Sequence, residues 1–316
     1  MHRLSAICFL LATLFLASTV QAQYKGSRIP GFLGVDSGTQ APAGLYAGNL
    51  LWVYPTDTIK DNFGNKINST GSLTTTADLI LVNLVTNVKI LGANYGASAA
   101  IPFMKNRIQF NSLDVGSNMA FSDTFYTPVS LGWHLKRADI TAAYNLYAPT
   151  GTFTPGAKNN TGLGMWGNEF SLGSTVYLDK KRSWTAAANY AMEFNSKKEG
   201  LDIRVGDMAT IEGGLGKKFF TKVQGPVPMI TTLGVAGYSQ FKVTGDSGSD
   251  IPLALRGYKD RVFAVGPEFS TYVPKPRLMF LVRYQPEFGA RNRTQGQTIL
   301  FSVTWTAKSL VKPKAP

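Results

Sequence analysis

Hydrophobic and polar residues alternate over much of the chain. In the stretch 261–290, for example, Phe280 and Val282 fall on one side of an extended backbone, while Arg283 and Glu287 fall on the other. Successive side chains of a β-strand point to opposite faces, so this pattern predicts strands with one apolar and one polar face. The apolar face could cover the core of a soluble sheet or the lipid side of a membrane barrel, and the alternation alone allows both.

The alternating runs and the turn residues between them predict twelve strands. A further stretch at 107–115 is assigned to a loop, because one more strand would break the even count of single-chain bacterial barrels. The predicted strands cover residues 45–55, 74–86, 88–103, 122–135, 139–149, 168–179, 183–195, 207–220, 229–243, 261–273, 277–289 and 297–307.

The connections between these strands alternate in length. Short turns are predicted at 86–87, 135–139, 179–182, 221–228 and 273–277, and longer Gly/Asn/Asp/Ser-rich segments at 56–71, 104–121, 149–167, 196–206 and 244–260. A barrel with both termini in the periplasm has short periplasmic turns and long external loops, whereas a soluble sandwich has no reason to sort its loops in this way. The alternation therefore predicts a single antiparallel outer-membrane β-barrel of about 12 strands.

Aromatic residues support a membrane barrel, because many fall near predicted strand ends, where rings can lie at the level of lipid headgroups. The last strand ends in alternating Phe301, Val303 and Trp305, a pattern typical of the strand that the barrel-assembly machinery recognises. The residues expected in the two aromatic girdles are Trp52, Tyr54, Phe103, Trp133, Trp184, Phe194, Phe219, Phe241, Phe263 and Trp305.

The first residues predict export. His2 and Arg3 precede an apolar run that ends before a small-residue cleavage site at Ala22. We therefore expect a signal peptide at 1–22, a periplasmic leader or plug at 23–44, the barrel at 45–307 and a basic tail at 308–316. No long apolar helix follows the signal, which argues against a helical membrane bundle.

Charge and cysteine content narrow the partners. The formal charge of +13 falls to +12 without residues 1–22, which hold Arg3 and no acidic residue. In an exported barrel this excess favours outer-membrane lipids and lipopolysaccharide over nucleic acid. The sole cysteine, Cys8, lies in the predicted signal, so the mature chain has neither disulfides nor thiol chemistry. No cofactor or metal is predicted.

Several charged residues fall on the polar face of the predicted strands, where they would point into the lumen. Such groups either brace a narrow lumen or line a path for solutes. A barrel of this size has a lumen between that of a filled eight-stranded barrel and that of a porin. The lumen candidates are Glu169, Glu193, Glu212, Lys218, Glu268, Arg283 and Glu287, and the candidates in the external loop are Pro149, Thr150, Gly151, Asn160 and Trp166.

Catalytic motifs are weak. Gly245-Asp246-Ser247-Gly248 resembles a serine-hydrolase nucleophile segment, but the only histidine after the signal, His134, is predicted at the opposite end of the barrel. The segment 214–218 resembles a phosphate loop but opens no helix. We therefore predict that the chain is not an enzyme.

Several segments resemble the family of outer-membrane proteins associated with meta-pathway phenol degradation. They are Lys89 to Gly96, Tyr147 to Gly151, Asn160 to Trp166, Glu212 to Lys217, Gly266 to Glu268 and Glu287 to Ala290. The resemblance covers essentially the whole mature chain and carries over no catalytic residue. It implies an outer-membrane barrel that takes up aromatic or other hydrophobic compounds.

These observations together predict a passive channel or facilitator for small hydrophobic, chiefly aromatic, compounds. Capture by the loop 149–166 would precede diffusion past a constriction lined by Glu212, Glu268, Arg283 and Glu287. Two alternatives remain open, namely an outer-membrane lipid-modifying hydrolase and a structural or adhesive barrel with no transport role.

Overall fold

The computed structural model describes residues 25–67, 70–110, 113–225, 227–251 and 256–311. The predicted signal peptide and most of the predicted basic tail lie outside these ranges. No helix among the described residues has the length and apolar character needed to cross a membrane.

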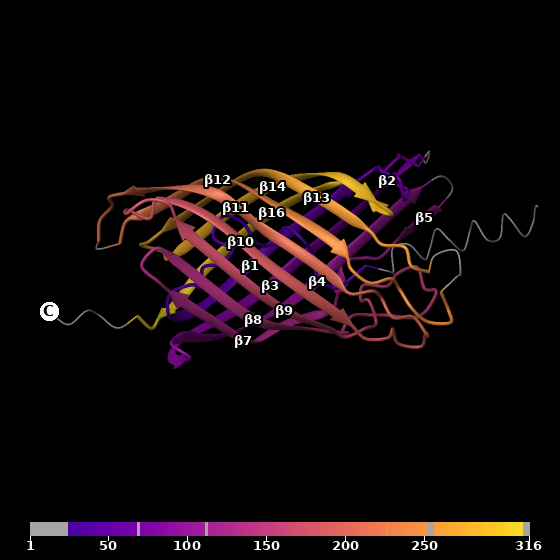
Figure 1. Ribbon diagram of the computed structural model, residues 1–316, viewed down its shortest axis with the longest axis horizontal. Helices are drawn as coiled ribbons and strands as arrows, with labels where there is room; N and C mark the ends of the chain where they lie inside the picture. Colours follow the sequence, from indigo (N-terminus) through magenta and orange to yellow (C-terminus); the bar gives the residue numbers. More distant parts are fainter. Residues whose placement is uncertain (1–24, 68–69, 111–112, 226, 252–255, 312–316) are drawn as a thin grey trace, which may run out of the picture.

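Twelve antiparallel strands form a closed barrel, as the sequence predicted (Figure 1). Barrel strands that follow one another in the sequence pair in the sheet, and pairing of the first strand with the last closes the ring. The strands are β1 (Gly44–Thr56), β3 (Gly71–Ile90), β4 (Ala93–Phe110), β7 (Thr124–His134), β8 (Ala138–Ala148), β9 (Gly167–Tyr177), β10 (Trp184–Asn195), β11 (Met208–Thr221), β12 (Met229–Lys242), β13 (Arg261–Val273), β14 (Leu278–Arg291) and β16 (Gln297–Ser309).

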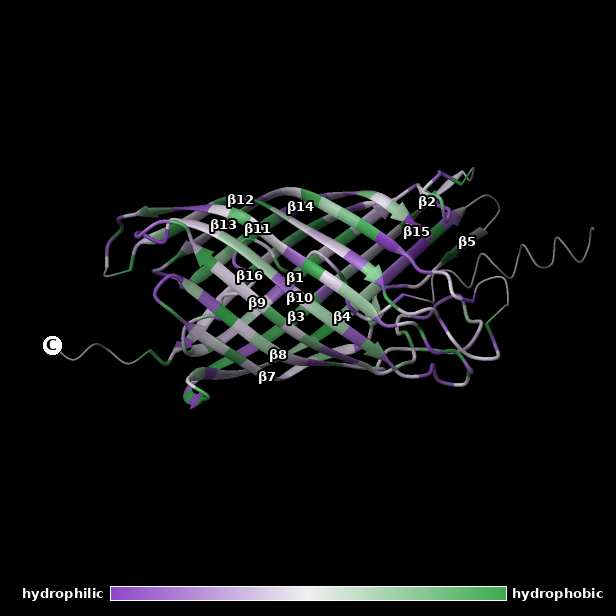
Figure 2. Ribbon diagram, viewed as in Figure 1, coloured by the Kyte–Doolittle hydropathy of each residue, from purple (hydrophilic) through white to green (hydrophobic). Residues whose placement is uncertain are grey.

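The outer face of the barrel is apolar. Strands alternate between hydrophobic and hydrophilic residues along their length (Figure 2), and outward side chains such as Leu233, Val235 and Phe301 are exposed. Lipid contact satisfies such a surface, and a closed barrel leaves no strand edge without backbone partners. This arrangement is that of a bacterial outer-membrane barrel.

The connections also follow the predicted alternation. Longer connections gather at one end of the barrel, and the C-terminus lies at the other end with the short turns (Figure 1). Three small pairings extend the long-loop end: β2 (Ile59–Lys60) with β15 (Arg293–Thr294), β5 (Leu113–Gly116) with β4, and β6 (Ala120–Phe121) with β4. By the same loop-length rule, the long-loop end is predicted to face the cell exterior and the short-turn end the periplasm.

Two local predictions are wrong. The turn expected at 86–87 lies at Leu91 and Gly92, whose positive φ angles of 50° and 80° form the tight hairpin turn. At the position where the turn was expected, β3 continues, with an irregularity in its pairing with β4 between Val85 and Lys89. The stretch 107–115 is also not a plain loop, because its two halves pair as a hairpin above the barrel wall. The strand count stays even, since this hairpin belongs to the loop.

Two of the predicted girdle residues point inward. Trp52 and Tyr54 are 6 % and 5 % exposed and face the lumen from β1, while the intervening Val53 faces outward. Proximity to a strand end was the basis of the prediction, and it does not determine which face a residue occupies. Trp184 and Trp305 are exposed on the outer surface, as a girdle requires.

Residues 25–43 run through the lumen, and we call them the lumen segment. At the long-loop end Lys25 Nζ donates a hydrogen bond to Thr294 Oγ1 (3.2 Å). At the short-turn end the carbonyl of Ala43 accepts one from the amide of Leu310 (2.8 Å), just before β1 begins. The segment therefore passes along the barrel axis inside the wall.

Candidate functional site

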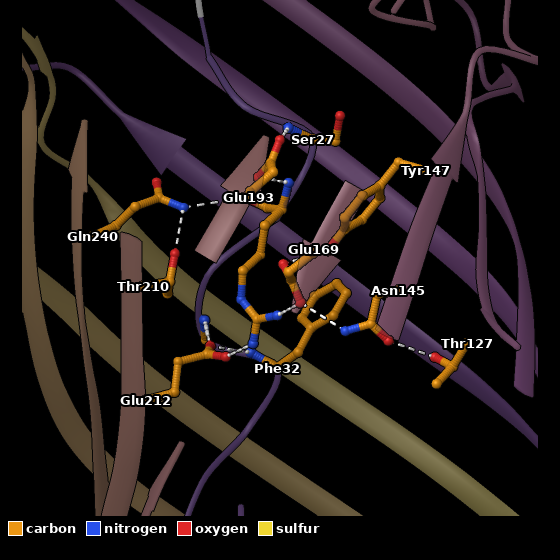
Figure 3. Close-up of polar contacts among 12 residues, drawn as sticks. Ser27, Phe32, Thr127, Asn145, Tyr147, Glu169, Glu193, Thr210, Glu212 and Gln240 are labelled. Carbon is orange, nitrogen blue, oxygen red and sulfur yellow. Dashed lines mark hydrogen bonds and ion pairs between the residues drawn. The ribbon is translucent and has the colours of Figure 1, made fainter. Parts of the chain in front are cut away.

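Three buried carboxylates hold the lumen segment near Arg28. Glu169, Glu193 and Glu212 project from β9, β10 and β11 and converge on the segment (Figure 3). Arg28 Nη1 donates to Glu169 Oε1 (2.6 Å), and its other terminal nitrogen pairs with Glu212. Glu193 accepts the backbone amides of Ser27 (2.6 Å) and Arg28 (3.1 Å). Charge-assisted hydrogen bonds of this kind are stronger than neutral ones, so this cluster anchors the segment.

Glu169 is held in turn by the wall. Asn145 Nδ2 and the Tyr147 hydroxyl donate to its two oxygens at 2.7 and 3.0 Å, and Thr127 donates to Asn145 Oδ1 at 2.8 Å. These hydrogen bonds come from residues of the barrel wall alone and hold the Glu169 carboxylate in a fixed orientation. The wall therefore presents a rigid acceptor to Arg28.

A second anchor lies on β13 and β14. Arg283 pairs with Glu268 through its Nε (2.8 Å) and Nη2 (2.7 Å), and its Nη1 donates to the carbonyl of Gly31 (2.6 Å). Both side chains are buried. A more exposed pair joins Lys218 Nζ to Asp36 (2.8 Å), with 15 % and 36 % of the two side chains exposed.

Glycines in the wall make room for the segment. Val35 packs against Gly214, Gly216 and Gly234, where an added Cβ would lie 2.6 to 3.1 Å from its side chain. Gly38 lies so close to β9 that a Cβ there would be 2.1 Å from the backbone of Ser174. The β11 glycines quoted in the family resemblance thus form a seat for the segment.

The predicted lumen residues therefore divide into two groups. Glu169, Glu193, Glu212, Glu268 and Arg283 lie beneath the lumen segment, whereas Lys218 and Glu287 border the open space. Glu287 accepts hydrogen bonds from the hydroxyls of Tyr54 (2.5 Å) and Tyr238 (2.8 Å). The first group contacts the lumen segment directly, and its place on a solute path stays a prediction.

The opposite wall of the lumen carries a large apolar cluster, with polar residues such as Thr75, Asn83 and Asn106 lining the space on the same strands. Side chains of β14, β16, β1, β3, β4 and β7, which are consecutive around the barrel, form one cluster facing inward. Ile29 and Phe32 of the lumen segment pack against it. The space between the two walls has a volume of about 2450 Å³. The members of this apolar wall are Leu50, Trp52, Tyr54, Leu73, Ala77, Leu79, Leu81, Ala100, Met104, Phe125, Leu281 and Leu300.

One feature of the sequence indicates this apolar wall, namely a run of consecutive apolar residues that interrupts the alternation. In β3 the run Leu79 to Val82 is apolar at every position, so both faces of the strand are hydrophobic. A strand that faces lipid on one side and water on the other would keep polar residues on its inner face. An unbroken apolar run in a barrel strand therefore indicates that the inner surface is apolar at the level of that run.

The external loop 149–166 is part of an interlocked cap that includes 196–207 and the described parts of 243–260. Asp123 accepts the amides of Gly151 (3.0 Å) and Leu163 (2.6 Å), and burial raises its pKa. Lys198 Nζ donates to the carbonyl of Leu163 (2.6 Å), and burial lowers the pKa of Lys198 to about 8. Arg204 and Ser247 exchange backbone hydrogen bonds of 2.7 and 3.0 Å between two loops.

The predicted loop residues contribute to this cap in different ways. Thr150 Oγ1 accepts the Thr124 amide (2.9 Å), and the Asn160 side chain exchanges bonds with the Thr154 backbone (2.9 Å each). Asn160 borders the open lumen, whereas the half-exposed Trp166 lies on the outside of that space. Pro149 ends β8 at the base of the loop.

The candidate hydrolase pair does not assemble. His134 Nδ1 lies 3.2 Å from the Asp139 carboxylate at the short-turn end, while Ser247 belongs to the cap at the other end. The segment 214–218 is part of β11. Among the described residues, no group of three potential metal ligands gathers.

A family model and a solved channel structure agree with this fold. The model of the family described as "Putative MetA-pathway of phenol degradation" matches residues 56–303, which confirms the resemblance found in the sequence. An outer membrane channel from Pseudomonas putida F1 superposes with a TM-score of 0.70 at 13% identity, covering 88% of this chain and 99% of that one. The beta domain of the Bordetella autotransporter BrkA reaches a TM-score of 0.45 at 12% identity, covering 83% and 99%. No curated protein matches the sequence.

Proposed function

We propose that this chain, which belongs to the phenol-degradation family whose model it matches, is an outer-membrane channel for small hydrophobic compounds, chiefly aromatic ones. The observation that carries the proposal is the apolar wall from β14 to β7. Porin lumens are polar because they conduct water-soluble solutes. An apolar inner surface beside an open space instead suits a solute that leaves water readily.

The two walls of the lumen have different roles. The polar wall, from β9 to β14, holds the lumen segment in place, and the apolar wall is left as the surface along which a solute moves. Ile29 and Phe32 narrow the path where they touch that wall. A solute passes this point when these side chains, or the segment that carries them, move aside.

The energetics suit transient binding. An aromatic ring the size of a side chain buries about 150–250 Å², which at about 25 cal/mol per Å² corresponds to about 4–6 kcal/mol at full burial. A ring that touches only one wall gains part of this amount. Solutes are then favoured over water in the lumen but still released at the periplasmic end, as conduction requires.

We propose no hydrolase role for His134 and Ser247, because residues at opposite ends of the barrel cannot act as base and nucleophile on one bond. We also retain lipids and lipopolysaccharide as partners, together with the barrel-assembly machinery during insertion. The support for lipid contact is a rim of exposed basic residues at the short-turn end of the barrel, beyond the aromatic residues of its outer surface. Anionic lipid headgroups would lie at this level. The rim comprises Lys136, Arg137, Lys180, Lys181, Arg182, Lys222, Lys275, Arg277 and Lys308.

Uptake measurements test the proposal. Cells that lack this chain are compared with cells that express it, using radiolabelled phenol, toluene and a neutral disaccharide at concentrations where the outer membrane limits entry. We expect expression to speed entry of both ring compounds and to leave the sugar unaffected. An equal gain for the sugar would identify a general pore, and no gain for the ring compounds would refute the channel.

A further inference from the structure

The indole nitrogen of Trp52 is buried without a hydrogen-bond partner. Among the described residues, no acceptor lies within hydrogen-bonding reach of Nε1, and the side chain is only 6 % exposed. The great majority of buried hydrogen-bond donors in proteins are paired, because an unpaired donor has given up its hydrogen bonds to water without replacing them. An unpaired donor in the wall of a cavity is therefore a candidate contact for a bound solute.

The surroundings explain why the protein itself supplies no acceptor. Trp52 lies opposite Leu300 on one neighbouring strand and Ala77 on the other. Its ring stacks on Tyr54, with centroids 5.6 Å apart and planes inclined by 3°. The Tyr54 hydroxyl already donates to Glu287 (2.5 Å), so it is committed elsewhere. Trp52 also lines the lumen, where Phe32 packs against the same apolar cluster. Its Nε1 atom is buried in this arrangement, so a solute reaches it only after neighbouring side chains move aside.

We propose that Trp52 is a binding station for a neutral aromatic solute that carries an oxygen acceptor, such as a phenolic hydroxyl or a ring carbonyl. The inference rests on the proposed channel function and names the class of solute that the apolar wall selects. The ring of the solute lies against the Leu50, Leu79 and Phe32 side chains, and its oxygen accepts the Trp52 N–H.

The chemistry of the donor sets the selectivity. An indole nitrogen donates and cannot accept, so the partner atom must be an acceptor. The nearby Glu287 carboxylate disfavours an anionic solute. A hydrocarbon ring of the same size fits the wall but leaves the donor unpaired, and the station gains nothing from Trp52 beyond packing. The pair phenol and benzene therefore differ at this site by one hydrogen bond.

A direct measurement uses the unmodified protein. The Trp52 indole ¹⁵N–¹H resonance is followed in detergent micelles during titration with 4-fluorophenol or fluorobenzene, and Trp52→Phe identifies the resonance by its loss. Binding of 4-fluorophenol should move the indole proton downfield to saturation, and fluorobenzene should cause a smaller shift of ring-current size. Equal shifts for both probes would overturn the proposal.

Affinities measured by ¹⁹F NMR supply a second test. Trp52→Phe keeps an aromatic ring and removes the donor, so 4-fluorophenol should bind about 2- to 13-fold more weakly, as expected for one neutral hydrogen bond, while fluorobenzene binds within about twofold of wild type. Trp184→Phe, on the outer surface, should change neither. Unchanged 4-fluorophenol binding in Trp52→Phe would refute the station and leave the channel standing. A wild-type protein that binds neither probe and speeds the uptake of neither ring compound would refute both.

Discussion

Removing Arg28 should release the lumen segment from the polar wall. The substitution Arg28→Ala leaves Glu169 and Glu212 buried without their cation, beside the equally buried Glu193. Breaking a buried pair by deleting one partner costs about 3–5 kcal/mol. If the segment detaches while the barrel stays closed, that cost raises the detached population by about 150- to 5000-fold.

Cysteine accessibility measures this release. Val35 is 1 % exposed in its glycine seat, and the predicted mature chain has no cysteine, so Val35→Cys introduces a single thiol that reagents reach only when the segment leaves the wall. With labelling slower than reseating, the rate reports the detached fraction. We expect Arg28→Ala to accelerate labelling by at least two orders of magnitude.

The matched control is the more exposed ion pair of the same segment. Lys218→Ala removes the partner of Asp36, and a pair of this exposure contributes about 1 kcal/mol or less, which corresponds to about fivefold in labelling rate or less. The reasoning fails if Arg28→Ala labels at the wild-type rate, or if Lys218→Ala has the larger effect. Heat-modifiable gel mobility confirms that each barrel is still closed.

Three further predictions follow from the segment and the cap. Gly38→Ala should weaken seating by about 1–3 kcal/mol, because its Cβ would meet the Ser174 backbone, and Val35→Cys labelling should accelerate accordingly while Ser37→Ala has little effect. Arg283→Ala should also accelerate labelling, because it frees the Gly31 carbonyl; changed solute charge selectivity without faster labelling would contradict the anchoring role. The pKa of Lys198 is about 8 in the folded cap and has its ordinary value of 10.5 in the unfolded cap. Between these two pH values the unfolded cap binds more protons than the folded cap. The folded cap therefore gains stability as pH rises from 8 to 10.5. Subtilisin cleavage of the cap, normalised to an unfolded peptide at each pH, should slow over that range, and Lys198→Met should remove the trend.

The barrel could be predicted from the sequence because its causes are local. Alternation fixes the face of each residue within a strand, and the lengths of the connections fix which end is outside. The Leu91–Gly92 turn was missed for an equally local reason, since leucine seldom adopts a positive φ and Thr86–Asn87 has the residue types of a turn. Trp52 was placed in the outer girdle because its position along the strand was considered without its face.

The site depends on contacts that no local pattern encodes. Arg28 meets Glu169 and Glu212 across 141 and 184 residues of sequence, and only the closed barrel brings them together. The inward position of the carboxylates followed from alternation, but what they bind did not. Glycines on β11 similarly acquire a role only once Val35 lies against them.

The central claim is that solutes move along the apolar wall. Leu81→Asn places an amide on that wall, and Thr232→Asn places the same amide on the polar wall bordering the same space. Loss of one leucine surface from the path should cost at least about 1.5 kcal/mol, or roughly tenfold in flux. Initial uptake of radiolabelled toluene by cells expressing equal amounts of each barrel should fall about tenfold for Leu81→Asn and stay within about twofold of wild type for Thr232→Asn. Equal uptake by the two variants would contradict the account.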